Sequence, residues 1–304
     1  MAETTRMNIS AGLASVSVAT VLVGLKLWAL GETGALSVAA SLADSAMDLM
    51  VSLGGLAAIA YAARPADEDH TWGHTSAEDL AALGQSLFIL VSAGVIGWAA
   101  VARLLDDAPV ALAHEGRGIL VMAVSIALTA GLVLWQRHVA RRTGSRVVKA
   151  DSLHYLGDLI PNLGAILSLW ASAAFGLGNI DSVVALGAAL MLAVGAIRIF
   201  KGAWDALMDR AAPDEVVAKV AGIVGGFPGV DDFHDLKTRM AGSKTFITVH
   251  IEQDGKKTLN ETHAVAAAVR RTLLGAVPGS DVLIHQDPTG EKPHPDDPSR
   301  RWRE

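Results

Sequence analysis

Residues 35–63 have the sequence ALSVAASLADSAMDLMVSLGGLAAIAYAA, in which Asp44 and Asp48 are the only charged side chains. A helix needs about 20 predominantly apolar residues to cross a bilayer, so this stretch is long enough to span one. A charged side chain at the bilayer centre costs roughly 2.5–3.5 kcal/mol on insertion scales. Two aspartates in this position therefore predict a compensating cation.

A second apolar stretch repeats the same spacing with His154 and Asp158. Residues four apart lie one above the other on a helix face, so two helices meeting along these faces would offer three carboxylates and one imidazole to a single centre. That ligand set suits tetrahedral coordination of a divalent metal such as zinc. The alternative is that the four side chains only join neighbouring helices by hydrogen bonds, a role usually taken in membranes by Ser, Thr, Asn and Gln.

The composition of the whole chain is that of a membrane protein. Of its 304 residues, 51% are hydrophobic and 18% are charged, and the mean hydropathy is +0.39. A soluble domain carries about a quarter charged residues. The net charge of −6 argues against nucleic-acid binding. Because the chain has no cysteine, any metal must bind through nitrogen or oxygen ligands, which directs attention to the ten histidines.

Apolar stretches of membrane-spanning length recur along the chain and predict six transmembrane helices. They cover residues 9–30, 35–63, 79–105, 117–140, 151–176 and 180–208. The first is long enough to remain as a span, so no cleaved signal peptide is expected. Arg and Lys are concentrated between the fourth and fifth spans, in residues 141–149. By the positive-inside rule both termini are cytoplasmic, in a multi-pass protein of the inner (plasma) membrane.

Three regions are expected along the chain: a six-helix transmembrane domain over residues 1–210, a cytoplasmic domain over 211–288 and a disordered tail over 289–304. In the cytoplasmic domain the pattern predicts the order αββαβ. The helices cover residues 213–227 and 259–275, and the strands cover 231–241, 244–253 and 280–287. An antiparallel sheet with both helices on one face, ferredoxin-like in the broad sense, is the simplest arrangement of these elements.

A loop between the second and third spans has the sequence DEDHTWGHT, with Asp67, His70 and His74 close together. Two histidines four residues apart can bind one metal from a helical turn, but Gly73 between them favours a loop folded around the ion. The alternative is a solvated loop that happens to contain histidines.

The cytoplasmic domain carries a third group of candidate metal ligands. Positions i and i+2 of a strand face the same way, so His285 and Asp287 can converge on one ion. Taken singly, each histidine of this domain is more often a surface residue or a hydrogen-bonded core residue than a ligand. The candidate ligands are His234, Asp235, His250, His263, His285 and Asp287.

Together these motifs resemble the cation diffusion facilitator family of bacterial metal transporters. The resemblance covers about residues 8–290 and rests on four features in order: D-x-x-x-D in the second span, D-x-x-H-x-x-x-H in the loop, H-x-x-x-D in the fifth span, and HQDP at the end of the cytoplasmic domain. It implies a homodimer that exports divalent metal, most often zinc, in exchange for protons.

The resemblance also assigns roles to the candidate residues. It implies that Asp44, Asp48, His154 and Asp158 form the transport site, that Asp67, His70 and His74 form a loop site, and that the cytoplasmic ligands form a binuclear dimerisation and regulatory site. In that site Asp235 bridges the ions or lies just outside their ligands.

The sequence therefore predicts a proton-coupled zinc exporter working by alternating access. Iron, cobalt, nickel, manganese and cadmium are alternative substrates, because three carboxylates and one imidazole do not select one metal by residue type alone. A membrane metalloenzyme would keep an open coordination position and a separate general base, and no H-E-x-x-H motif is present. A membrane metal sensor could use the cytoplasmic histidines but would not need the intramembrane group.

Overall fold

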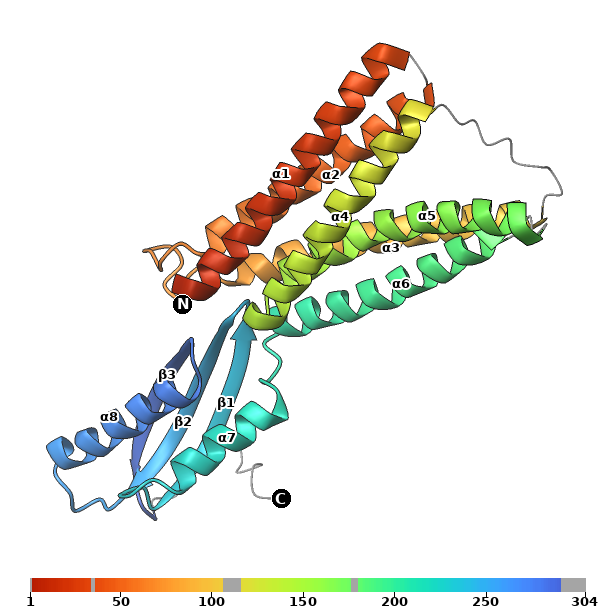
Figure 1. Ribbon diagram of the computed structural model, residues 1–304. Helices are drawn as coiled ribbons and strands as arrows, with labels where there is room; N and C mark the ends of the chain where they lie inside the picture. The colour runs from red at the N-terminus through yellow and green to blue at the C-terminus, as the bar shows by residue number, and fades with distance from the viewer. Residues whose placement is uncertain (1, 34–35, 106–115, 176–179, 291–304) are drawn as a thin grey trace. The chain divides into compact units, whose positions relative to one another are not determined.

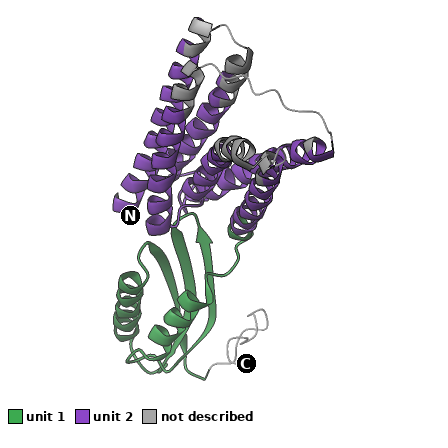
Figure 2. Cartoon of the chain, turned by 45° about the vertical axis from the view of Figure 1, so that its right-hand side comes forward, with its two compact units in different colours: residues 1, 205–304 green, residues 2–204 purple. Residues whose placement is uncertain are grey.

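A computed structural model of the chain describes residues 2–33, 36–105, 116–175 and 180–290. The chain divides into two compact units, residues 2–204 and residues 205–304 (Figure 2). The tail expected over residues 289–304 falls almost entirely outside the described residues.

Six long helices run through the first unit (Figure 1). They are α1 Ala2–Thr33, α2 Leu36–Ala62, α3 Ser76–Leu105, α4 Gly116–Thr143, α5 Arg146–Phe175 and α6 Ile180–Leu207. Each corresponds to one predicted span. Within the described residues, all but α5 contain a stretch that is long and apolar enough to cross a membrane. The predicted α-helical membrane domain is confirmed. The exception, α5, is the helix that carries His154 and Asp158.

Close contacts between these helices depend on small residues, as is usual in membranes. A Cβ atom added to Gly195 of α6 would lie 2.8 Å from Leu153 Cδ2 of α5, and one added to Gly157 of α5 would lie 3.2 Å from Leu192 Cδ1 of α6. Large apolar side chains instead point outward, and Trp98 is 78% exposed. This inverted pattern fits helices whose outer surface is covered by lipid.

The second unit contains α7 Asp214–Gly225, β1 Asp232–Ala241, β2 Lys244–Gln253, α8 Leu259–Ala276 and β3 Ser280–Pro288. This is the predicted αββαβ order. The three strands lie in the order β1-β2-β3, with β1 antiparallel to β2 but β2 parallel to β3. The prediction of a wholly antiparallel sheet is wrong, because α8 carries the chain back along the sheet before β3 begins.

Both helices of this unit pack on the same face of the sheet. Ile247, Val249 and Ile251 alternate along β2 and are buried in one cluster with residues of α7 and α8, among them Val220 and Leu273. The side chains between them on β2 point to the opposite face. That face holds the strand histidines, so the sheet separates an apolar core from a polar surface.

Candidate metal sites

The transmembrane unit brings Asp48, His154 and Asp158 together. Asp48 lies near the middle of α2, and the other two occupy successive turns of α5. His154 Nε2 lies 3.0 Å from Asp48 Oδ1. One ligand atom from each of the three residues lies within 4.8 Å of the others. This spacing suits ligands arranged around one cation. The side chain of Asp44, one turn before Asp48, lies outside the described residues.

The surroundings of His154 are shielded from solvent. The side chains of His154 and Asp48 are 9% and 15% exposed. The ring of Phe88 on α3 meets the His154 ring edge-on, with 5.6 Å between centroids. Charges held here are poorly solvated, so a bound cation would offset the cost of burying the carboxylates.

The structure also shows polar residues beside this site that sequence reasoning missed. Gln136 Nε2 on α4 donates a 2.6 Å hydrogen bond to Asp151 Oδ2, and Asp151 is buried one turn before His154 on α5. The Tyr155 hydroxyl lies 2.8 Å from Ser52 Oγ of α2. The sequence did carry a signal for Asp151, because it is an ionisable residue in an apolar helix, three positions before His154. No sequence signal pointed to the tyrosine and serine contact.

The loop residues Asp67, His70 and His74 also converge. His74 Nε2 lies 3.2 Å from Asp67 Oδ2, and His70 Nδ1 lies 3.3 Å from Asp67 Oδ1. Ligand atoms of all three lie within 4.8 Å of one another. Gly73, with φ of +89°, keeps the segment from being helical, and α3 begins only at Ser76. The segment is a loop, as Gly73 predicts.

This loop places its ligands in unequal environments. The His74 side chain is 2% exposed and packs against the Tyr61 ring at 4.6 Å, whereas the side chains of Asp67 and His70 are about half exposed. The backbone N–H of His70 donates a 2.7 Å hydrogen bond to Asp67 Oδ1, and this bond lowers the pKa of Asp67 below its ordinary value. The carboxylate is therefore already ionised for metal binding at neutral pH.

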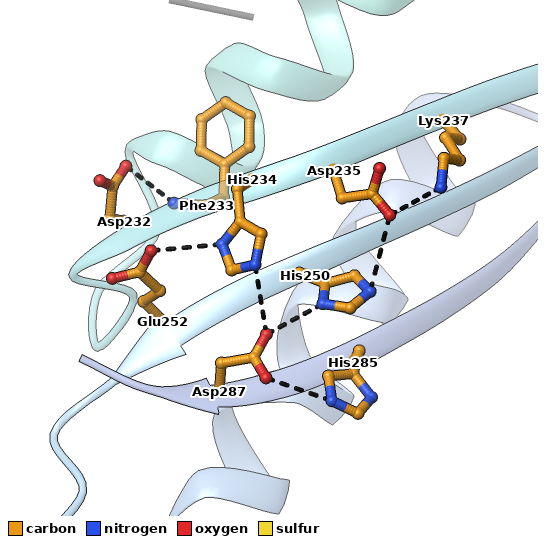
Figure 3. Close-up of polar contacts among 9 residues, drawn as sticks. All are labelled: Asp232, Phe233, His234, Asp235, Lys237, His250, Glu252, His285 and Asp287. Atoms are coloured by element: carbon orange, nitrogen blue, oxygen red, sulfur yellow. Dashed lines mark hydrogen bonds and ion pairs between the residues drawn. The ribbon is translucent and has the colours of Figure 1, made fainter. Parts of the chain in front are cut away.

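In the second unit, which corresponds to the predicted cytoplasmic domain, strand pairing lines up three histidines across the sheet. His234 of β1 pairs with His250 of β2, which pairs with His285 of β3. Asp287 lies two residues after His285 and therefore on the same face (Figure 3). Its Oδ2 lies 2.9 Å from His250 Nδ1 and 3.5 Å from His234 Nε2. His234, His250 and Asp287 have ligand atoms within 4.8 Å of one another.

Further residues surround this centre (Figure 3). His285 Nε2 lies 3.2 Å from Asp287 Oδ1. Asp235 lies at a β-bulge, with φ of +46°, and its Oδ2 is 3.9 Å from His250 Nε2 and 2.8 Å from Lys237 Nζ. Glu252 Oε1, which the sequence did not suggest, lies 3.2 Å from His234 Nδ1.

His263 is the cytoplasmic candidate that the structure places apart. It is exposed on α8, the layer that covers the opposite face of the sheet from the histidine row. Among the described residues it belongs to none of the three groups whose ligand atoms converge. His263 is separated from the histidine row because α8 packs on the apolar face of the sheet, through Ala266, Val269 and Leu273.

Comparison with known proteins gives these sites a context. Residues 12–208 match the family description "Cation efflux transmembrane domain", and residues 212–289 match "Cation efflux protein, cytoplasmic domain". The chain belongs to the cation diffusion facilitator family. It is 39% identical to the cation-efflux pump FieF of Shigella flexneri and 41% identical to that of Yersinia enterocolitica, each over 288 residues and 95% of both chains.

Part of the chain is also similar to proteins of solved structure. One is the metal-bound C-terminal domain of the CzcD transporter from Thermotoga maritima, which is 29% identical. That match covers 25% of this chain and 91% of the other, with a TM-score of 0.25.

Family membership decides between the classes of function left open by the sequence. The chain is a transporter that exports divalent cations, and not a metalloenzyme or a sensor alone. It is a multi-pass protein of the inner membrane.

Proposed function

We propose that this protein exports zinc from the cytoplasm in exchange for protons, by alternating access. The observation that carries the proposal is the convergence of Asp48, His154 and Asp158 between α2 and α5, with Asp44 one turn away on α2. We assign these four residues to the transport site. An imidazole beside carboxylates suits zinc and its neighbours among the transition metals better than magnesium or calcium.

Proton coupling is supported by the contact between His154 and Asp48. The 3.0 Å contact needs a proton on His154 Nε2 or on the carboxylate, and a metal ligand must be deprotonated, so a cation entering this site displaces that proton. Protons arriving from a more acidic exterior then compete the metal off. One pH unit across the membrane supplies about 1.4 kcal/mol per proton. A membrane potential adds about 2.3 kcal/mol per charge per 100 mV.

The other two groups are assigned to the same transport cycle. Asp67, His70 and His74 form a site that loads or retains metal at the cytoplasmic surface. The cytoplasmic ligands form a regulatory zinc site in a homodimer, and they are His234, Asp235, His250, His285 and Asp287. His263, which lies on the other layer of the same unit, is left out of this assignment. Alternating access needs two arrangements of the transmembrane helices, and metal bound at the regulatory site favours one of them. Residues 1–210 then serve transport and residues 211–288 serve metal binding and dimerisation.

The proposed direction depends on the orientation of the chain. Arg141, Arg142, Arg146 and Lys149 lie at the junction of α4 and α5. By the positive-inside rule, this concentration of cationic side chains places the junction on the cytoplasmic side of the membrane. Both termini then lie on that side as well. Metal from the cytoplasm would then meet the loop before it reaches the intramembrane ligands.

A competitive flux assay in proteoliposomes tests the proposal. Zinc, iron, cobalt, nickel, manganese and cadmium are offered together, and zinc is expected to be carried best. His154→Ala should abolish zinc flux without unfolding the protein, whereas His138→Ala, which removes an exposed histidine of α4, should leave it intact. Faster transport of another ion would contradict the zinc assignment, and normal flux in the His154 variant would contradict the site.

A further inference from the structure

A basic cavity lies between α4, α5 and α6, apart from the three metal sites. Its volume is about 580 Å³. The residues that line it include Arg137 and Arg141 from α4, Lys149 and Ser152 from α5, and Gly195 and Arg198 from α6. Among the described residues, this lining has four cationic side chains and no acidic one.

The charge of this cavity is not neutralised within the part of the chain that the structure describes. None of the four cationic side chains pairs there with a carboxylate. Four positive charges gathered around one cavity repel one another and would repel a metal cation. They favour an anion, and arginine suits phosphate because its planar group can donate two parallel hydrogen bonds.

The surroundings place the cavity at the depth of lipid headgroups. Trp135 on α4 and Trp204 on α6 are 42% and 51% exposed. Exposed tryptophans on spanning helices are typical of the membrane interface. Leu190 and Ile197 on α6 are exposed apolar residues that precede Trp204 and provide a surface for acyl chains. An amphiphilic anion fits both the charges and the apolar surface.

The cavity also adjoins the helix segment that carries the transport site. Ser152 and Leu153 of α5 line it directly before His154, and Leu153 packs tightly against Gly195 of α6. A ligand joining α4, α5 and α6 here would restrain the helix that positions His154 and Asp158.

We propose that this cavity binds the phosphate group of an anionic phospholipid and thereby holds the ends of α4, α5 and α6 together. A free phosphate offers the same charge but lacks an apolar part to cover the exposed residues of α6. The orientation proposed above would place this lipid in the cytoplasmic leaflet. The binding itself does not depend on which metal is transported.

Native mass spectrometry of the detergent-solubilised full chain with phosphatidylglycerol tests this proposal. The variant Arg141→Gln/Arg198→Gln removes two charges from the cavity. Its matched control, Arg142→Gln/Lys201→Gln, removes two charges from exposed residues of the same helices that do not line the cavity. The test variant should bind about 25-fold more weakly, because each Lys or Arg beside anionic lipid contributes about fivefold. The control should bind as the wild type does.

Equal weakening in both variants would overturn the site, because it would indicate only general surface charge. Wild-type binding of phosphatidylcholine as strong as that of phosphatidylglycerol would overturn recognition of an anionic group. Displacement of the lipid by equimolar inorganic phosphate would overturn the choice of a lipid over free phosphate. If the double variant does not fold, Lys149→Gln alone should weaken binding about fivefold, and unchanged binding would contradict the proposal.

Discussion

At the scale of single residues, His154 has the most distinctive chemistry in the proposed transport site. It is the only nitrogen ligand beside Asp48 and Asp158 in the described part of the site, and its ring is buried against Phe88. A neutral imidazole binds zinc well, whereas carboxylates alone suit harder ions such as manganese. Selectivity among metals is therefore expected to depend on this side chain.

His154→Asp should shift the preference from zinc towards manganese or iron. The expected change in the zinc-to-manganese transport ratio is on the order of tenfold, equivalent to about 1.4 kcal/mol. Competitive flux in proteoliposomes measures this ratio, with His138→Asp as a control for an added carboxylate elsewhere. An unchanged ratio would show that the geometry of the site, and not the nitrogen ligand, sets selectivity.

At the scale of helices and strands, one ion pair ties α5 to α3. Arg146 at the start of α5 donates a hydrogen bond to Asp79 in the first turn of α3. The Asp79 side chain is 1% exposed and that of Arg146 is 24% exposed. Removing one partner of a buried pair is more harmful than replacing both, because the remaining charge stays buried. This contact therefore helps to fix the helix that carries His154 and Asp158.

Arg146→Ala should destabilise the protein by about 3–5 kcal/mol. Thermal unfolding in detergent measures the loss, and Arg142→Ala, an exposed neighbour, serves as the control. Asp79→Asn in the Arg146→Ala background should recover part of the stability because it removes the buried charge. No recovery in the double variant would contradict an electrostatic origin of the effect.

The start of α8 makes a pH-dependent contribution to the cytoplasmic unit. Glu261 accepts hydrogen bonds from the backbone N–H and the hydroxyl of Thr258, each 2.8 Å long, and the backbone bond is the main reason that the pKa of Glu261 is lowered. The folded pKa lies below the unfolded value of 4.5, so the stabilisation is present above pH 4.5 and is lost as the pH falls through the folded pKa.

Glu261→Gln should therefore lower the free energy of unfolding at pH 7, and the difference from wild type should shrink below about pH 4.5. Urea unfolding of residues 211–290 over this pH range measures it. Glu215→Gln, in the first turn of α7, is a control because no side-chain hydrogen bond caps that helix. A difference that persists undiminished at pH 3 would contradict the role of the carboxylate.

At the scale of the whole molecule, the proposed exchange requires that metal and proton use the same intramembrane ligands. An acidic exterior with an alkaline interior should therefore accelerate zinc export, and inverting the gradient should reverse the effect. Binding of zinc should release at least one proton. Flux in proteoliposomes with imposed gradients, and calorimetry in buffers of different ionisation enthalpy, measure these effects. Flux that is indifferent to both gradients would indicate a uniporter.

The two units of the molecule are expected to be coupled through the regulatory site. Truncation after residue 211 keeps all four transport ligands but removes the cytoplasmic cluster, so it should weaken dimerisation and raise the metal concentration needed for transport. The expected coupling is about 1–3 kcal/mol, or roughly 5–150-fold in concentration. Flux titrations of the truncated and full chains measure it. Failure of residues 211–290 to bind zinc in calorimetry would contradict the regulatory role.

The sequence by itself determined the family, the six helices and the order of the cytoplasmic elements. These features depend on local information: the length of each apolar stretch, the spacing of Asp44 and Asp48 or of His154 and Asp158, and the alternation along strands. Such patterns survive without knowledge of neighbours because bilayer thickness and helical periodicity impose them on each segment separately.

The tertiary structure decided which distant residues meet. It paired β2 in parallel with β3, placed His234, His250 and His285 in one row, and left His263 on the opposite layer. It also gathered the charges of α4, α5 and α6 around one cavity. Strand direction and helix contacts depend on packing between segments far apart in the chain, so periodicity within each segment carries no information about them.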